Sequence, residues 1–544
     1  MNQIKQQLSH LVENRPFVVL ALIIVGALLI QGTLAATKTT ISHDETISYL
    51  SAIGRQGDFE QILRDNQYPA NQWVPVREWK AWFAVAEPFS FRQIGLDLAE
   101  SDIHPPLYFW TLHIWTWLFG VHAWTGPALN MVFQAVGALG LFALGRRMLK
   151  NNFEALAVVF IWLLSPASLT MVLEARQYTL FGICTIFFVW LVVVATDKAS
   201  HPTWTHWLLL LLATAAGALT HYHFALVVFV AGPVFVLKLV RRDFRRVLWV
   251  GTAVLMGYVL SFILHPRFYQ SIQELSRRQV LEAEFLSGQF EFFQRVYLVG
   301  KTFTGYWTVS GILQLALFCL FLASIIWVGM IFVRNRRLVQ ETIQTKNFTG
   351  YELGLFFVCL AGLSILLYLT YVSPIHAMTE RHMSAVWPFY PFLAIFLLRL
   401  VGQAKRNRLT ILVGTAVLLS GFFMVWQMGT AVDEPAWDDV VYSDSRERFV
   451  VDGVYQGILP RIFFQLPDDA LIYVAAQNEL LAQPEAWLPA LDTNSVYISE
   501  LSYDNTEDNR DKIVALIAQQ FQVTTRPVDN WTIGQPYFIE PVNE

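Results

Sequence analysis

Residues 105–120 read PPLYFWTLHIWTWLFG, and whether this run crosses a membrane decides the fold. The run is apolar, but it is shorter than the about 20 residues that a spanning helix needs, and it opens with two prolines. Its Trp and His side chains suit a helix that lies along a membrane interface. The charges in the rest of the chain decide between these two readings.

The composition identifies a membrane protein. Of the 544 residues, 55% are apolar and 15% are charged, whereas soluble domains are about 25% charged. The mean hydropathy is +0.43. These values exclude a wholly soluble, disordered, collagen-like or coiled-coil chain. Three cysteines are too few for a disulfide framework. We therefore expect a polytopic membrane protein with a water-soluble part.

Eleven further runs are candidates for spanning helices. They are 17–36, 124–145, 154–173, 177–195, 204–220, 222–240, 247–264, 311–333, 352–372, 382–399 and 409–430. The first is longer than the apolar part of most cleaved signal peptides, so it is read as an uncleaved helix. The stretch 204–240 is read as two short helices broken at His221-Tyr222-His223.

Lys and Arg in short loops stay on the cytoplasmic side of a membrane. If 105–120 spans, the basic clusters at 146–150 and 238–246 fall outside; if it lies along the outer interface, every basic cluster falls inside. The second arrangement places 19 basic and six acidic residues in the cytoplasm, a net +13 against −17 outside. We therefore predict an all-α polytopic bundle of about eleven spans, with a cytoplasmic N-terminus.

This topology leaves three large pieces outside. Two are the loops 37–123 and 265–308, the second with the spacing of amphipathic helices. The third, 431–544, carries 20 acidic and six basic residues, with strand-like runs such as SVYISE at 495–500. We predict two domains, a transmembrane domain at 1–430 and a small extracytoplasmic α/β domain at 431–544.

Unusual polar residues gather at the predicted outer ends of the helices. His43-Asp44-Glu45 follows the first span; it is either a solvated helix start or a carboxylate that accepts a proton from a hydroxyl or holds a cation. His104 opens the interfacial run. Glu174 and Arg176 either pair with each other or bind a headgroup.

Two arginines, Arg176 and Arg381, are the basic residues of the short outer loops, and arginine matches phosphate oxygens well. The chain has no P-loop, no G-x-G-x-x-G after a strand, no G-x-S-x-G and no H-E-x-x-H. Its basic residues are scattered, so nucleic acid is not expected as a partner. An enzyme working outside the cytoplasm would need a donor delivered in the membrane.

The order of these motifs resembles a known family. An acidic pair after the first helix precedes HPPLY at 104–108, EARQY at 174–178, a His-Tyr turn at 221–222 and Glu-Arg at 380–381. Over residues 15–400 this is similar to the GT-C membrane glycosyltransferases, in the branch of family 39 that includes protein-mannosyltransferase-like and aminoarabinose-transferase-like enzymes.

The resemblance implies transfer of a sugar, with inversion, from a polyprenyl-phosphate carrier to a protein, lipid or glycan acceptor outside the cytoplasm. It implies that Asp44 is the catalytic base, accompanied by Glu45. It also implies donor or substrate binding by His104, Glu174, Arg176, Tyr178, His221, Tyr222 and Arg381. A divalent cation, Mg²⁺ or Mn²⁺, stays open as a cofactor, with Asp44 as a candidate ligand.

Two other classes of function stay open. A transporter or lipid flippase would carry ionisable residues near the middle of its spans, where this chain has almost none. A non-catalytic partner in envelope assembly would use 431–544 as a docking module. The expected partners are the lipid-linked donor, the acceptor and membrane lipids, and the expected location is the plasma membrane.

Overall fold

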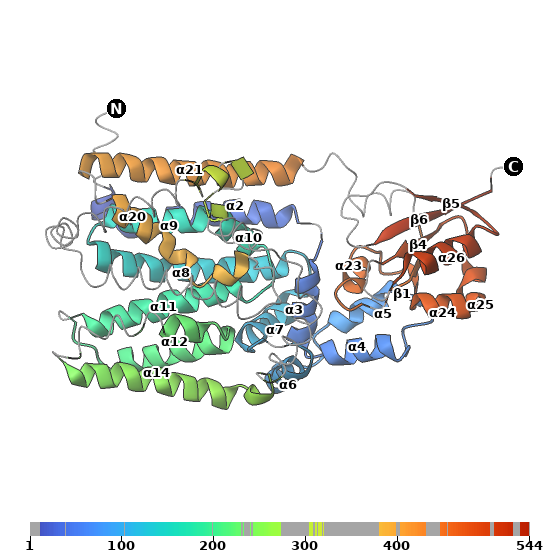
Figure 1. The fold of residues 1–544 in the computed structure, drawn as a ribbon, viewed down its shortest axis with the longest axis horizontal. Coiled ribbons are helices and arrows are strands. Elements are labelled where there is room, and N and C mark those ends of the chain that lie inside the picture. Colours follow the sequence, from blue (N-terminus) through green and yellow to red (C-terminus); the bar gives the residue numbers. More distant parts are fainter. Residues whose placement is uncertain are drawn as a thin grey trace. The chain divides into compact units, whose positions relative to one another are not determined.

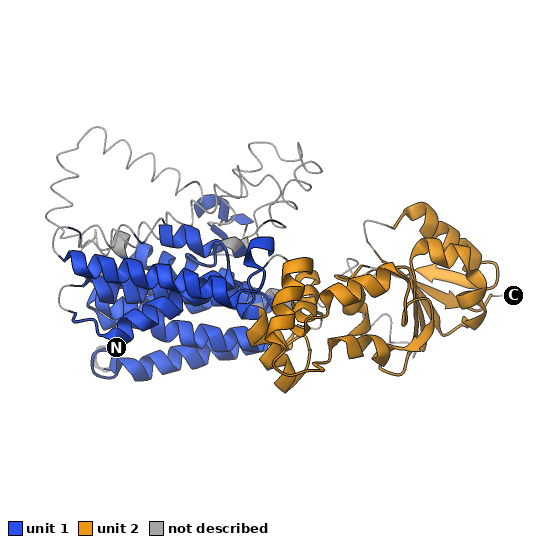
Figure 2. Ribbon diagram, turned by 90° about the horizontal axis from the view of Figure 1, so that it is seen from below, with its two compact units in different colours: residues 1–34, 103–108, 127–426 blue, residues 35–102, 109–126, 427–544 orange. Residues whose placement is uncertain are grey.

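The computed structural model describes most of the chain. The described residues are 11–229, 243–271, 380–398, 403–430, 446–500, 505–525 and 534–542, with short gaps at 39, 103, 198–199 and 454, and a few residues between 232 and 319. The predicted span 352–372, most of 311–333, residues 230–231 and 233–239 of the predicted span 222–240, and most of loop 265–308 lie outside them. The chain divides into two compact units (Figure 2): residues 1–34, 103–108 and 127–426, and residues 35–102, 109–126 and 427–544.

The first unit is a helical bundle (Figure 1). Among the described residues, five helices are long and apolar enough to cross a membrane: α2 (Pro16–Ala36), α8 (Thr125–Leu149), α11 (Tyr178–Thr196), α14 (Phe244–Leu264) and the Asn407–Met424 part of α21 (Gln403–Thr430). Each overlaps a predicted span. A shorter apolar helix, α12 (Trp204–Thr220), ends where the sequence predicts a break, at His221.

The predicted span 154–173 is a pair of helices and not one. Helix α9 (Asn152–Leu164) and helix α10 (Pro166–Val172) are bent by 55° at the residue between them. That residue, Ser165, is followed by Pro166, which has no N–H to continue the helix. The Ser165 side chain accepts a hydrogen bond from the backbone of Ser168, so it caps the second helix.

Side chains from neighbouring helices satisfy the carbonyls near this bend. Gln134 on α8 donates through Nε2 to the carbonyl of Ser168, at 3.1 Å. Gln31 on α2 donates to Gln134 Oε1 at 2.7 Å and to the carbonyl of Leu163 at 3.4 Å. Polar groups are costly inside a membrane unless they are paired. These glutamines therefore stabilise an otherwise unfavourable break.

The predicted span 382–399 begins later than expected. Two 3₁₀ turns, η3 (Glu380–Met383) and η4 (Trp387–Phe389), precede the helix α20 (Tyr390–Leu398). Pro388 and Pro391 explain the difference, because proline fits only the first turn of a helix.

Burial separates the central helix of the bundle from the outer ones. In α11, 89% of the spanning window is buried, against 22% in α2 and α14. The helices α12 and α14 pack closely at Gly257, where an added Cβ would lie 2.7 Å from the carbonyl of Leu211. Close approach at small residues is usual between helices in membranes. The apolar surface left exposed on α2 and α14 is the kind that lipid covers.

The second unit contains a six-stranded sheet in the order β1-β3-β2-β4-β6-β5. The strands are β1 (Trp73–Pro75), β2 (Arg448–Val451), β3 (Leu471–Val474), β4 (Ser495–Ser499), β5 (Gln522–Thr525) and β6 (Gln535–Glu540). Strands β3, β2 and β4 are parallel, and the other pairings are antiparallel. The sheet is thus built mainly from the C-terminal segment, with one short strand from the first predicted loop.

Short helices surround this sheet. They are α23 (Leu459–Phe463), α24 (Gln477–Ala482), α25 (Pro484–Trp487), the 3₁₀ turn η6 (Leu488–Ala490) and α26 (Glu507–Ile517). Trp487, Ile513 and Ile517 from these helices pack on one face of the sheet, against Val450 and Tyr497. Burial of such side chains contributes about 1.5–3 kcal/mol each.

The carboxyl ends of β2 and β4 meet at one buried carboxylate. Asp452 accepts hydrogen bonds from Tyr497 Oη, Ser499 Oγ and Gln477 Nε2, at 2.5, 2.9 and 2.7 Å. It also accepts one from the backbone N–H of Glu500, at 2.6 Å. Burial raises the pKa of Asp452. The carboxylate joins two parallel strands and the start of α24.

The first predicted loop is largely helical. It forms α3 (His43–Ile53), α4 (Gln56–Arg64), α5 (Val76–Lys80), the 3₁₀ turn η1 (Ala81–Phe83), α6 (Phe91–Ser101) and α7 (Leu107–Phe119). The run 105–120 corresponds to α7, whose 13 residues extend only about 20 Å. This is shorter than the about 30 Å hydrocarbon core of a bilayer, in line with the prediction that the run does not span.

Candidate functional site

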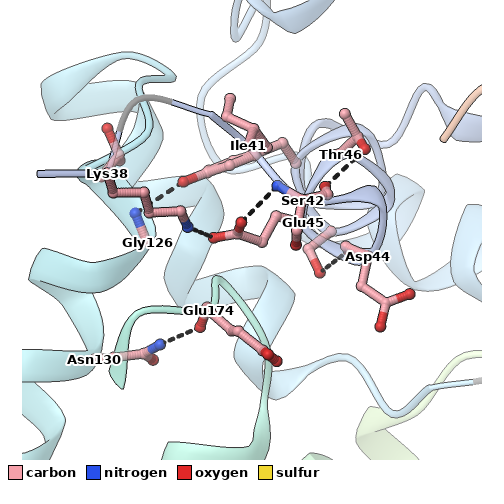
Figure 3. A network of polar contacts seen from close by, with 12 residues as sticks. Lys38, Ile41, Ser42, Asp44, Glu45, Thr46, Gly126, Asn130 and Glu174 are labelled. Atoms are coloured by element: carbon pink, nitrogen blue, oxygen red, sulfur yellow. Dashed lines mark hydrogen bonds and ion pairs between the residues drawn. The ribbon is translucent and has the colours of Figure 1, made fainter. Parts of the chain in front are cut away.

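In the second unit, the predicted residues His43, Asp44 and Glu45 form the first turn of α3. Glu45 accepts a hydrogen bond from the backbone N–H of Ser42 at 2.8 Å, which closes a capping box. Its other carboxylate oxygen forms an ion pair with Lys38 (Figure 3). The Glu45 side chain is 1% exposed. The carboxylate is therefore held inside the fold, where an incoming hydroxyl would not reach it easily.

An arginine from the C-terminal segment reinforces this turn. Arg461 on α23 donates through Nε to the carbonyl of Ile41, at 3.0 Å. Burial lowers the pKa of Arg461, and the charge of Glu45 acts in the opposite direction. Lys38, Glu45 and Arg461 thus form a charged group around the start of α3. Sequence reasoning missed Arg461, because nothing in its local sequence connects it to residue 41.

Asp44 differs from Glu45 in its surroundings. Its side chain is 24% exposed and points away from the Lys38–Glu45 pair (Figure 3). Its Oδ1 lies 3.2 Å from Nδ1 of His43. The Nε2 atom of the same ring lies 2.8 Å from the hydroxyl of Tyr455. Of the two predicted carboxylates, Asp44 is the one that a ligand can approach.

In the first unit, the predicted EARQY motif forms a tight turn between α10 and α11. The backbone N–H of Arg176 donates to the carbonyl of Glu174 at 2.7 Å. Asn130 on α8 donates through Nδ2 to the carbonyl of Glu174 (Figure 3) and to the carbonyl of Val172. Sequence reasoning missed Asn130. The signal that could have identified it is its amide side chain within an otherwise apolar helix, because polar residues in spanning helices often have a functional role.

The structure brings three of the predicted residues together beside this turn. Arg381 on η3 lies with its guanidinium carbon 5.5 Å from the centre of the Tyr178 ring. One of its Nη atoms is 4.0 Å from Glu174 Oε2. The side chains of Arg381 and Glu174 are 28% and 34% exposed, so both remain partly accessible. Arg176, in contrast, is buried.

His221 lies among aromatic rings at the end of α12. Its ring stacks on Phe181 at 4.7 Å and lies 5.9 Å from Tyr178 and 6.4 Å from His104. The backbone N–H of His223 donates to His221 Nδ1 at 3.2 Å. Because Nδ1 accepts, the neutral ring carries its proton on Nε2. Predicted residues that are far apart in sequence are thus neighbours.

The side chain of Tyr222 contacts His265. Its hydroxyl lies 3.1 Å from Nε2 of His265, the residue that caps α14. Nδ1 of His265 lies 2.9 Å from the carbonyl of Pro266 and must donate to it, so Nε2 accepts from Tyr222. Sequence reasoning missed His265, which lies in the loop 265–308.

The described residues provide little support for a metal site. Within the part of the chain that the structure describes, no group of three or more His, Cys, Asp or Glu side chains could hold an ion. The Oδ1 atom of Asp44 lies 3.2 Å from Nδ1 of His43. A hard divalent cation such as Mg²⁺ or Mn²⁺ prefers several oxygen ligands. The described part of the chain shows no such cluster around Asp44.

Comparison with known proteins agrees with the resemblance found in the sequence. Residues 103–265 match the family model described as dolichyl-phosphate-mannose-protein mannosyltransferase. This segment includes His104, the 174–178 turn and the 221–222 turn; Asp44 and Arg381 lie outside it. No curated protein matches the chain.

Three solved structures are similar to the chain. Apo ArnT from Cupriavidus metallidurans is 11% identical with a TM-score of 0.50, covering 95% of this chain and 97% of ArnT. ArnT bound to undecaprenyl phosphate is 10% identical, with a TM-score of 0.48 and coverage of 96% and 98%. The Archaeoglobus fulgidus oligosaccharyltransferase in complex with Zn and sulfate is 11% identical, with a TM-score of 0.44 and coverage of 88% and 68%.

At this low identity, the likeness to apo ArnT concerns the fold alone. Together with the family match, it confirms the resemblance to the GT-C membrane glycosyltransferases. The chain therefore has a fold similar to that of apo ArnT, with apolar helices that are long enough to cross a membrane.

Proposed function

We propose that this chain is an integral-membrane glycosyltransferase that moves a sugar, with inversion, from a polyprenyl-phosphate carrier to an acceptor outside the cytoplasm. The family match over residues 103–265 supports the class of reaction. The distribution of Lys and Arg supports a cytoplasmic N-terminus, and we assign the protein to the plasma membrane. The sugar and the acceptor, which is a protein, lipid or glycan, are left unnamed.

The observation that carries the proposal is the placement of Arg381. Its guanidinium lies over Tyr178 and beside Glu174, partly exposed, at the turn that the family model includes. A planar guanidinium can donate two parallel hydrogen bonds to phosphate oxygens. Arg381 is therefore assigned to the phosphate of the carrier. Tyr178 and Glu174 are assigned to holding the guanidinium in place.

The leaving group of this reaction is a phosphate ester, which needs charge stabilisation more than it needs a strong acid. The acceptor oxygen attacks the anomeric carbon and forms the new glycosidic bond. The bond from that carbon to the phosphate oxygen breaks, and its electron pair leaves with the polyprenyl phosphate. Asp44 takes the proton of the acceptor hydroxyl.

The other predicted residues have supporting roles in this proposal. His104 and His221 belong to the aromatic group beside Tyr178 and are assigned to the donor. Tyr222, which donates to His265, is assigned to shaping the same region. The buried Arg176 is assigned to the structure of its turn. Glu45, which the resemblance pairs with Asp44, is assigned to holding the start of α3.

The test is sugar transfer by the purified protein in liposomes, with a set of labelled polyprenyl-phosphate sugars and acceptors. The wild-type protein is expected to transfer or hydrolyse at least one donor. Asp44→Asn is expected to lower the rate by at least 100-fold while the protein stays folded, because the amide cannot take the proton. Glu87→Gln, at an exposed carboxylate of the first loop, serves as the matched control.

Two outcomes would contradict the proposal. Full transfer by Asp44→Asn would remove the assignment of the base. Tight binding of carrier lipids by the wild-type protein, with no transfer or hydrolysis of any donor, would favour a flippase or a non-catalytic envelope partner.

A further inference from the structure

We propose that Tyr455 and His43 are positioning residues for Asp44, so that the C-terminal segment takes part in the transfer reaction. This inference rests on the proposed function, in which Asp44 is the base. It assigns to Tyr455 a role that neither the family match nor the sequence motifs assign.

The three side chains form a continuous chain of polar contacts. The Tyr455 hydroxyl lies 2.8 Å from His43 Nε2, and His43 Nδ1 lies 3.2 Å from Asp44 Oδ1. The rings of His43 and Tyr455 are stacked, with centroids 5.3 Å apart and planes at 23°. The contact therefore fixes both the position and the plane of the imidazole.

The chemistry of the groups determines the direction of each hydrogen bond. An ionised carboxylate can only accept, so His43 donates to Asp44 from Nδ1. The Nε2 atom of the neutral ring is then an acceptor, and the Tyr455 hydroxyl donates to it. Both bonds point toward the carboxylate. Each strengthens the other through polarisation, and together they orient the lone pairs of Asp44.

The backbone around Tyr455 is anchored to the same turn of α3. Thr46 Oγ1 lies 3.1 Å from the carbonyl of Gly457 and 2.7 Å from the carbonyl of His43. An added Cβ at Gly457 would lie 2.2 Å from Cδ2 of His43 and 3.1 Å from the Tyr455 ring. Only glycine permits this close approach. The segment 455–457 is thus fitted to the His43 ring by its shape and by the polar contact of Gly457 with the Thr46 side chain.

The charged side chains around the first turn of α3 interact with groups other than Tyr455. Lys38 and Glu45 are paired with each other, and Arg461 donates to the backbone of Ile41. A Tyr455→Phe substitution changes none of these charges. It removes one hydroxyl and keeps the stacked ring, so its effect on catalysis would pass through His43 and Asp44.

The experiment compares Tyr455→Phe with the wild-type protein in the transfer assay. We expect kcat to fall by about 10- to 100-fold while KM for the donor stays nearly unchanged, by analogy with the loss of a hydrogen-bond partner of a metal-ligating side chain. The acidic limb of the kcat–pH profile is expected to move to higher pH, because the carboxylate is less stabilised. Tyr68→Phe, at an exposed tyrosine of the same unit, is the matched control.

A double-variant cycle separates positioning from a merely structural role. If Tyr455 acts through Asp44, adding Tyr455→Phe to Asp44→Asn leaves the residual rate unchanged. A structural contribution would lower that residual rate by the same factor as in the wild-type protein. It would also leave the pH profile in place. Either result would overturn the inference.

A second measurement needs no activity. Diethyl pyrocarbonate reacts with accessible imidazole nitrogens, and mass spectrometry gives the rate at His43. Tyr455→Phe is expected to raise that rate severalfold, because Nε2 loses its partner; an unchanged rate would show that the contact does not hold the ring. If the wild-type protein transfers no sugar, the proposed function fails and the inference with it. If wild type transfers and Tyr455→Phe matches it, the inference alone fails.

Discussion

The guanidinium of Arg381 lies 5.5 Å from the centre of the Tyr178 ring, although the two residues belong to distant parts of the sequence. The geometry is that of a cation–π contact. Glu174 stands 4.0 Å from the same guanidinium. The contacts hold a partly exposed positive charge in one orientation, which is what recognition of a lipid-linked phosphate requires.

Substitution of Arg381 tests this assignment. Charge-assisted hydrogen bonds contribute about 1.5–3 kcal/mol each, so Arg381→Ala is expected to weaken binding of a polyprenyl phosphate by roughly 10- to 150-fold. Arg381→Lys keeps the charge but loses the paired donors, so it is expected to recover only part of the affinity. Titration of the purified variants with polyprenyl phosphate in detergent measures both effects.

Arg245→Ala is the control, because this arginine is exposed near the start of α14. Its affinity for polyprenyl phosphate is expected to equal that of wild type. Equal affinity for Arg381→Ala and wild type would remove Arg381 from donor binding. Full recovery by Arg381→Lys would show that charge alone matters, without the guanidinium geometry.

Glu45 and Asp44 are neighbours with different expected roles. Glu45→Gln removes the negative charge from the buried pair with Lys38 and weakens the capping bond to Ser42. Leaving a buried charge without its counterion costs several kcal/mol at most, and we expect a loss of about 1–3 kcal/mol in unfolding free energy. Chemical denaturation of the protein in detergent measures this loss.

The double variant Lys38→Met with Glu45→Gln removes both charges and is expected to recover part of the lost stability. The rate of sugar transfer per folded molecule is expected to stay within a few-fold of wild type for Glu45→Gln. A rate as low as that of Asp44→Asn, in a protein of unchanged stability, would instead make Glu45 a catalytic group.

The sequence predicted the spans that are single uninterrupted apolar runs. Helices α2, α8 and α11 begin and end near the predicted residues, because length and hydropathy alone define them. The break at His221 was also predicted, since polar residues interrupt the run there. The bend at Ser165 was not, because the run stays apolar through it and the signal is a single Ser-Pro pair.

The sequence identified individual residues of the candidate site, but it did not predict which of them lie next to one another. The motifs indicated Glu174, Tyr178 and Arg381 separately, and only the fold shows that they touch. Tyr455 had no signal, because an isolated tyrosine in a segment rich in strands gives no hint of a contact with His43. The strand β1 was missed because three residues are too few for a periodic pattern.

Asp97 makes the stability of the second unit depend on pH. The carboxylate on α6 accepts hydrogen bonds from the backbone N–H groups of Gln56 and Gly57, at 3.0 and 2.9 Å, at the start of α4. Burial nevertheless raises the pKa of Asp97 from 3.8 to about 6. The nearby acids Asp58 and Glu60 act in the same direction.

The sign of the effect follows from proton binding. Between pH 3.8 and about 6, the folded protein holds a proton on Asp97 that the unfolded chain has released. Folding is therefore favoured by protonation, and this contribution is fully present below pH 3.8 and lost as the pH rises through about 6. A shift of this size corresponds to about 3 kcal/mol of unfolding free energy.

Asp97→Asn removes the titrating group and is expected to remove that decline. The measurement is chemical denaturation in detergent at several pH values from 4 to 7, with the difference between wild type and variant isolating Asp97 from all other titrating groups. Asp65→Asn, at an exposed carboxylate immediately after α4, is the control and is expected to keep the wild-type slope. If Asp97→Asn lost stability with rising pH as steeply as wild type, the carboxyl would not be protonated in the folded protein, and the two backbone hydrogen bonds would outweigh its burial.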